Sequence, residues 1–275
     1  MRCRRWMQRI MTGTTCWVLI LAMLFPLCWL VITATRKQSE AFSLPPRLFC
    51  MPTLENFEEV LGRSSFLPAC LNTLIIAAVT VTLGLAFGVP CGYALARSKS
   101  RLGRAMGVWI LMARMVPAIG FVIPFYSLFR RLGLNDSYFT ISLIYLTIVL
   151  PFTAWLMMGF IKGIPEQIEE AAMMDGCSRA QTLVRVIVPV CGPGIATSAI
   201  FAFMLSWNEF FYAMIMTGRN TKVVSVVIQG FITTTGTEWG RLCAAATLIV
   251  FPIILFTAFA QKALVRGLTI GAVKG

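Results

Sequence analysis

The sequence contains no histidine among its 275 residues. Histidine is the usual acid–base residue near neutral pH and the commonest metal ligand, so its absence excludes imidazole-based catalysis and histidine-ligated metals. None of the nine cysteines forms a CxxC pair. Five lie in apolar runs, where a thiol behaves as a small apolar group: Cys16, Cys28, Cys91, Cys191 and Cys243. We therefore expect neither a disulfide framework nor a metal site.

Signatures of phosphate-binding, dinucleotide-binding and hydrolytic sites are also missing. The sequence has no GxxxxGK[ST], GxSxG, GxGxxG or HExxH pattern. We expect no catalytic residue and no cofactor, and if the protein uses ATP, another chain must bind it. A membrane-embedded enzyme would need polar residues that converge at one depth, and the sequence shows no such group.

Charge is scarce, at 13% of residues, while 58% are hydrophobic and the mean hydropathy is +0.80. Soluble domains average about 25% charged and about 45–50% apolar residues. A hydrocarbon core of about 30 Å needs roughly 20 apolar residues per helix. The sequence therefore predicts an all-α polytopic membrane protein with six transmembrane helices, near residues 15–35, 70–95, 105–129, 138–161, 191–216 and 242–261.

The first apolar segment follows the basic run MRCRRWMQR, which is also typical of a signal peptide. Its apolar core is longer than a signal core, contains Pro26 and reaches Arg36–Lys37 without a clean cleavage site. We therefore predict a retained helix. The expected organisation is an N-terminal helix with an extracytoplasmic loop over 1–69, a transmembrane core over 70–265 and a tail over 266–275.

The formal net charge of +13 suggests two partners, nucleic acid or a lipid bilayer. The basic residues lie between apolar runs and form no continuous face, so we do not expect nucleic-acid binding. Fourteen of the 24 Lys and Arg lie in 1–14, 97–104, 162–187 and 262–275, which would all face the cytoplasm if the N-terminus does. This bias predicts a membrane protein with both termini in the cytoplasm.

All cytoplasmic carboxylates of this topology lie in one stretch, IPEQIEEAAMMDG. They are Glu166, Glu169, Glu170 and Asp175. Pro165 suits the first turn of a short helix, whose N-terminus favours the negative charges that follow. Such helices are marginal alone in water and need a partner surface. The anionic inner leaflet attracts basic segments, so the acidic stretch better suits a protein groove lined by basic groups.

A second short helix is predicted after a tight turn. Gly176 suits the turn because it tolerates positive φ, and Ser178 with Gln181 forms a capping-box pattern. Pro189 marks the entry to the fifth span. In the second span, the four-residue spacing of Gly84, Gly88 and Gly92 gives one face on which a neighbouring helix can approach closely. Pro117, Pro124, Pro151 and Pro252 should kink their spans.

The sequence EEAAMMDG, nine residues and then VIVP resembles the EAA loop of binding-protein-dependent ABC importer permeases. Glu170, Ala171, Ala172, Gly176 and Pro189 match in register, with Val186 and Val188 in place of the usual Ile and Leu. RLGLNDS, SWNEFFYAM and the ending from WGRLCAAATL also resemble the family. The ending is similar to that of the second permease subunit of maltose-type carbohydrate importers.

The resemblance implies a type I ABC importer permease fold with cytoplasmic coupling helices at 165–187. It implies a second, homologous permease, two ABC ATPase subunits and an extracytoplasmic sugar-binding protein as partners. Glu170, Ala171, Ala172, Asp175, Gly176 and Pro189 would then form the ATPase-docking site.

Polar residues inside spans are candidates for the translocation path. We expect Arg114 and the SWNEFF residues Trp207, Asn208 and Glu209 to border it. Alternatively, Arg114 extends to the cytoplasmic surface and Glu209 makes a hydrogen bond that shapes a bend. So few ionisable residues within the spans, and no internal repeat, argue against the alternative of an ion-gradient-driven secondary transporter.

Overall fold

The computed structural model describes residues 2–37, 51–63, 65–113, 115–234 and 236–272, and the side chains of these except 2–10, 111 and 259–272. Among the described residues, the regular secondary structure is helical except for one two-stranded antiparallel hairpin. The elements are α1 (Arg2–Ala34), α2 (Glu55–Gly62), α3 (Phe66–Arg97), α4 (Arg101–Ala113), α5 (Ala118–Arg131), α6 (Tyr138–Lys162), α7 (Glu166–Met174), α8 (Arg179–Thr182), η1 (Leu183–Ile187), α9 (Val188–Val190), α10 (Gly192–Trp207), α11 (Phe211–Met216), α12 (Val224–Val227), η2 (Ile228–Phe231), β1 (Ile232–Thr233), β2 (Gly236–Thr237) and α13 (Trp239–Ala272).

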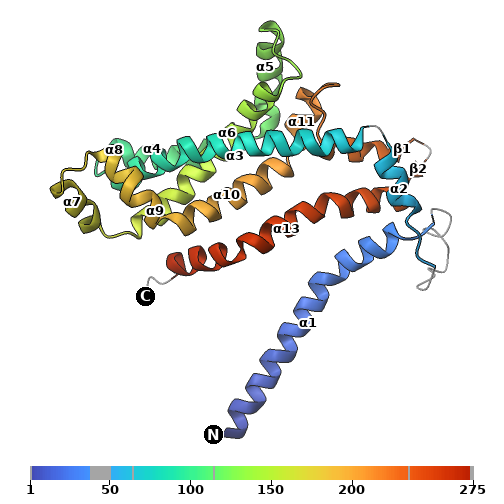
Figure 1. The fold of residues 1–275 in the computed structure, drawn as a ribbon, viewed down its shortest axis with the longest axis horizontal. Helices are drawn as coiled ribbons and strands as arrows, with labels where there is room; N and C mark the ends of the chain where they lie inside the picture. Colours follow the sequence, from blue (N-terminus) through green and yellow to red (C-terminus); the bar gives the residue numbers. More distant parts are fainter. Residues whose placement is uncertain (1, 38–50, 64, 114, 235, 273–275) are drawn as a thin grey trace. The chain divides into compact units, whose positions relative to one another are not determined.

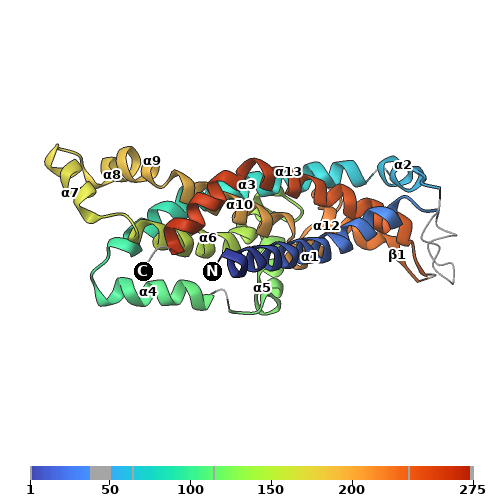
Figure 2. The ribbon, with the colours of Figure 1, turned by 90° about the horizontal axis from the view of Figure 1, so that it is seen from below.

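The chain divides into two compact units. The first comprises residues 1–66 and 228–251, and the second comprises residues 67–227 and 252–275. The second unit holds the α3, α6 and α10 helices, which lie alongside one another (Figures 1 and 2). The acidic stretch also belongs to the second unit.

The glycine face of α3 packs against α6, as its spacing predicted. A Cβ on Gly88 would lie 2.7 Å from Thr153 Cγ2, and a Cβ on Gly92 would lie 2.8 Å from the carbonyl oxygen of Ala154. Only a residue without a side chain permits this approach. Gly84 meets Val149 in the same way.

Two apolar clusters fill the second unit. One joins α3, α5, α6 and α11 around the fully buried Ile76, Ile144 and Tyr145. The other lies toward the acidic stretch, where Met157 and Ile161 of α6 pack with Ile187. The second cluster therefore gives the start of the loop after α6 a rigid base.

Ion pairs and an amide hold the first unit together. Arg63 and Arg241 each pair with Glu238 at 2.8 Å, and Arg241 also pairs with Glu59. The buried Asn56 amide donates hydrogen bonds to the carbonyl oxygens of Ala34 at 2.8 Å and Arg36 at 2.6 Å. These contacts tie the end of α1 and the start of α13 to α2.

Some of the six predicted spans are single long helices in the structure, and others are divided. In the described part of the chain, four helices are long and apolar enough to cross a membrane, Met11–Ala34, Phe66–Arg97, Tyr138–Lys162 and Trp239–Ala258, and a bent pair ending at Trp207 brings the number to five. The segment predicted over 105–129, with a kink at Pro117, is divided there into two helices, because α4 ends at Ala113 and α5 begins at Ala118. Pro117, directly before α5, lacks an N–H and disfavours helical backbone in the residue before it.

Two further boundaries differ from the expectation. The segment predicted at 191–216 is divided at Asn208–Phe210 into α10 and α11. The tail expected after residue 265 is helical as far as Ala272, since it extends an existing helix and needs no nucleation of its own.

Candidate functional site

The acidic stretch forms the predicted helix–turn–helix, which lies beyond one end of the α3–α6–α10 bundle (Figures 1 and 2). Pro165 is the N-cap of α7 and not its first helical residue. Gly176 has φ +90°, which confirms the predicted turn. The N–H of Cys177 donates to Ala172 at 3.0 Å and the N–H of Gly176 donates to Met173 at 3.1 Å. These two bonds form a Schellman motif, so the glycine sets the angle between the helices.

The second helix begins with the capping box that the sequence predicted. The Gln181 N–H donates to Ser178 Oγ at 3.4 Å, and the Ser178 N–H donates to Gln181 Oε1 at 2.8 Å. After one turn the chain adopts a π-helix over Leu183–Ile187, then the short α9 that contains Pro189. The α8–α9 segment meets α10 at 81°. The loop is therefore joined to the bundle through a sharp corner at Cys191.

Glu169 anchors α7 to the end of α3. Its Oε1 lies 2.6 Å from Arg97 Nη2 and accepts a hydrogen bond from Arg97 Nε at 2.7 Å, while Tyr93 donates to its Oε2 at 2.9 Å. Arg97 also donates to the carbonyl oxygen of Ile164 at 2.9 Å. The exposed fractions of the two charged side chains are 16% for Arg97 and 7% for Glu169. This largely buried pair holds the start of the loop on the bundle.

Sequence reasoning did not single out Glu169 from its acidic neighbours. A signal was present, because Ala172 lies three residues after Glu169 and so shares its side of a helix. Both residues are buried, whereas Glu166 and Glu170 are exposed. The inward side of α7 therefore consists of one small residue and one carboxylate that meets Arg97.

The outward side of α7, which includes the predicted docking residues Glu170, Ala171 and Asp175, is an exposed surface. Ala171 and Asp175 are exposed, and Asp175 is the C-cap of α7. Glu166 forms an exposed ion pair with Lys99 at 3.2 Å. A hollow of about 700 Å³ lies beside α7, and Glu170, Met173 and Arg179 contribute to its lining. Met174 at the end of α7 is 88% exposed.

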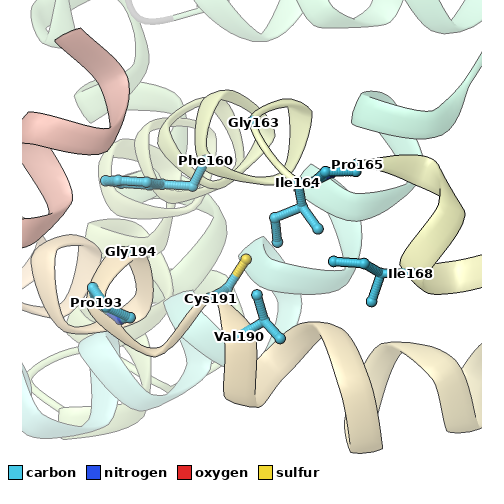
Figure 3. A pocket seen from close by; sticks show the side chains of 9 residues that line it. All are labelled: Phe160, Gly163, Ile164, Pro165, Ile168, Val190, Cys191, Pro193 and Gly194. Atoms are coloured by element: carbon cyan, nitrogen blue, oxygen red, sulfur yellow. The ribbon is translucent and has the colours of Figure 1, made fainter. Parts of the chain in front are cut away.

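A smaller apolar pocket of about 210 Å³ lies beneath the loop. The side chains of Ile164, Ile168 and Cys191 point into the same space (Figure 3). Phe160 lies at its edge and contacts Gly194 so closely that a Cβ there would be 2.7 Å from the Phe160 ring. The loop thus rests on α6 and α10 through apolar side chains and on α3 through the ion pair.

Three of the predicted path residues, Trp207, Asn208 and Glu209, lie at the opposite end of α10 from the loop. The fourth, Arg114, lies outside the described residues. Trp207 is buried and packs against Phe203, with ring centroids 5.3 Å apart, while Asn208 is exposed. Glu209 Oε1 accepts a hydrogen bond from the Tyr212 N–H at 3.0 Å. The structure therefore brings Trp207, Asn208 and Glu209 together at the α10–α11 break, well separated from α7.

A family profile described as "Binding-protein-dependent transport system inner membrane component" matches residues 88–270. This match covers the loop, both of its flanking helices and the α10–α11 break. The chain belongs to this family. It is thus a multi-pass inner-membrane protein and a permease component of an ABC transport system.

Curated relatives match this permease over nearly its whole length. It is 36% identical to a probable ABC transporter permease of Sinorhizobium fredii, over 94% of this chain and 92% of that protein. It is 32% identical to the diacetylchitobiose uptake system permease protein DasC of Streptomyces coelicolor, over 97% and 98% of the two chains. It is 33% identical to the trehalose transport system permease protein SugB of Mycobacterium tuberculosis, over 81% and 82%.

Solved structures share the fold. A chain of a bacterial ABC transporter involved in the import of the acidic polysaccharide alginate superposes with a TM-score of 0.76 at 24% identity, covering 93% of this chain and 95% of that chain. The predicted all-α type I importer permease fold is thereby confirmed.

Proposed function

We propose that this permease forms, with a second homologous permease, the translocation path of a carbohydrate importer. Two separate ABC ATPase subunits hydrolyse ATP, and an extracytoplasmic binding protein delivers the sugar. The printed names of the diacetylchitobiose and trehalose relatives support carbohydrate as the substrate class. An alginate transporter with this fold has been solved with its periplasmic protein bound, which supports the binding-protein partner.

The α7–α8 loop is the ATPase-docking site in this proposal. The observation that carries this proposal is that two adjacent carboxylates differ in burial and in ion pairing. Glu169 is buried against Arg97 and holds the loop to the bundle, whereas Glu170 is exposed and no ion pair that the structure describes involves it. An exposed carboxylate beside the exposed Met174 offers both charge and apolar area to a partner groove lined by basic groups.

The rigid base of the loop gives it a role in energy coupling. Arg97 links the loop to α3, and the corner at Cys191 links it to α10. When the docked ATPases close, movement of α7 and α8 is then transmitted to the helices around the path. Both termini, on this account, face the cytoplasm with the loop.

We further propose that Arg114, Trp207, Asn208 and Glu209 border the path, with different tasks. The hydrogen bond from Tyr212 to Glu209 supports a role for that carboxylate in shaping the α10–α11 break. The exposed Asn208 is the member of this group best placed to meet a solute.

Reconstitution of the full importer in proteoliposomes tests the function. Uptake of radiolabelled trehalose, maltose or diacetylchitobiose should require ATP and the ATPase subunits. It should stop when the ATPase carries a substitution in its phosphate-binding lysine, and it should persist when a protonophore collapses the proton gradient. Uptake by the permeases alone, abolished by the protonophore, would instead establish an ion-gradient-driven secondary transporter.

A further inference from the structure

A cavity of about 660 Å³ lies where two interrupted helices of the second unit meet. The break between α4 and α5 forms one side of it, and α11, which follows the break after α10, contributes Tyr212. Figures 1 and 2 show α5 running across the direction of α4 at this break. The volume falls within the range of about 300–1,000 Å³ that is usual for small-molecule sites.

In the N-terminal turn of α5 the Gly120 N–H already donates to the carbonyl oxygen of Pro117 at 3.0 Å, so a ligand could accept only from the N–H groups before it. No described side chain caps the N-terminus of α5, where Pro117 is the N-cap, and Ala118 lines the cavity. In the predicted topology the break lies between the cytoplasmic segment 97–104 and the outer segment 130–137. Irregular backbone at membrane depth is tolerated where it faces protein or a water-filled space. A lipid chain has no hydrogen-bond acceptor for the first N–H groups of α5, whereas a sugar hydroxyl oxygen accepts from such groups.

Aromatic faces provide the second half of the site. Trp109 is 69% exposed and Phe121 is 44% exposed, and both line the cavity. Phe121 stacks on Phe125 with ring centroids 6.1 Å apart. The negative face of an aromatic ring attracts the polarised C–H groups on one side of a pyranose. The Thr147 hydroxyl donates to the carbonyl oxygen of Ile144 at 2.6 Å, and the buried Tyr212 hydroxyl is hydrogen-bonded to Thr147, so toward a sugar these groups offer oxygen lone pairs as acceptors.

We propose that this cavity is a subsite of the translocation path that holds one ring of the carbohydrate, stacked on Trp109 and Phe121. The inference rests on the proposed function and names the residues that contact the substrate in this subunit. Stacking with few hydrogen bonds gives weak binding, which suits a site that a solute must both enter and leave.

The test uses the complete importer in nanodiscs with its binding protein, arrested with a non-hydrolysable ATP analogue. Radiolabelled maltose, trehalose and diacetylchitobiose are added in turn, and the label retained after gel filtration is measured. Trp109→Leu and Phe121→Leu should lower retention by about tenfold, because each removes a stacking face. Trp109→Phe should preserve most of it. Phe87→Leu is the matched control, since Phe87 is 60% exposed on α3 and does not line the cavity.

The outcomes separate the two proposals. Unchanged retention in both leucine variants, with import intact, would overturn the subsite alone. Reduced retention in a complex that fails to import any sugar would support the subsite and overturn ATP-driven import. Loss of the second permease from purified Trp109→Leu would assign the cavity to the contact between permeases and overturn the subsite. Failure of the unsubstituted complex to retain any of the three sugars would count against both.

Discussion

At the residue scale, Glu169 and Glu170 are sequence neighbours with opposite surroundings. Glu169→Ala would leave the partly buried guanidinium of Arg97 without its carboxylate, although its bond to the carbonyl oxygen of Ile164 would remain. Breaking a fully buried pair costs about 3–5 kcal/mol and an exposed pair contributes about 0–1 kcal/mol, so the cost here lies between these values. We therefore expect Glu169→Ala to lower the thermal unfolding temperature of the detergent-solubilised permease clearly, and Glu166→Ala, which removes only the exposed pair with Lys99, to leave it nearly unchanged. Equal unfolding temperatures for the two variants would show that the buried pair does not stabilise the loop.

Gly176 is a second single residue on which the loop depends. A Cβ there would meet no atom within 4 Å, so the whole cost of Gly176→Ala comes from the backbone at φ +90°. That cost is about 1–2 kcal/mol. Gly159→Ala is the matched control, because its Cβ would also meet nothing within 4 Å and Gly159 lies in the regular helix α6. We expect Gly176→Ala to lower the unfolding temperature and Gly159→Ala to raise it slightly or leave it unchanged. The opposite order would contradict the strained turn.

Among the helices, the contact between α3 and α6 should lose different amounts of stability when different glycines of α3 are replaced by alanine. A Cβ at Gly92 meets backbone atoms, the carbonyl oxygen of Ala154 at 2.8 Å and the amide nitrogen of Met158 at 2.9 Å, which move only with the helix. A Cβ at Gly84 meets the Val149 side chain at 2.7 Å, which has some freedom to move. Overpacking typically costs about 1–3 kcal/mol. Denaturation of both alanine variants should show the larger loss for Gly92→Ala, and a larger loss for Gly84→Ala would mean that the helices separate easily.

Asp136 joins the loop between α5 and α6 to the loop between α11 and α12 by hydrogen bonds. Gly218 and Thr221 N–H donate to its Oδ1 at 2.8 and 3.0 Å, and Asn220 N–H donates to its Oδ2 at 2.9 Å. Partial burial alone would raise the pKa of the Asp136 carboxyl, but these bonds and that from the Thr221 hydroxyl hold the pKa below its ordinary value.

The sign of the pH effect follows from this lowered pKa. The stabilisation is present above the unfolded-state pKa of about 3.9 and is lost as the pH falls through the lower folded-state pKa. Unfolding temperatures measured from pH 7 down to pH 3 should therefore fall less steeply for Asp136→Asn than for the unsubstituted protein. Parallel curves would exclude Asp136 as a contributor.

Over the whole molecule, the features predicted correctly from the sequence are those set by residues close together in the chain. The Gly176 turn, the Ser178–Gln181 cap and the α3 glycine face depend on residues close in the chain, and all three are present. A kink at Pro117 was predicted, but the full division into α4 and α5 was not, because hydropathy averages over a window and does not register one lost N–H. The partner of Glu169 was missed because Arg97 lies 72 residues away, and no local pattern joins them.

In the proposed importer, the exposed side of α7 docks the ATPase. Glu170→Ala and Glu166→Ala provide the most direct measurement, because both remove an exposed carboxylate from the same helix and only Glu170 lacks a described ion pair within the chain. Co-purification of the ATPase and ATP-driven sugar uptake are measured for both variants. The same measurements are made for Glu170→Lys, alone and in combination with an ATPase in which a basic residue of the groove is replaced by an acidic one. We expect Glu170→Ala to lose most uptake and ATPase association, Glu166→Ala to keep both, and the reversed pair to restore Glu170→Lys partly. Wild-type uptake and association in both alanine variants would contradict this proposal.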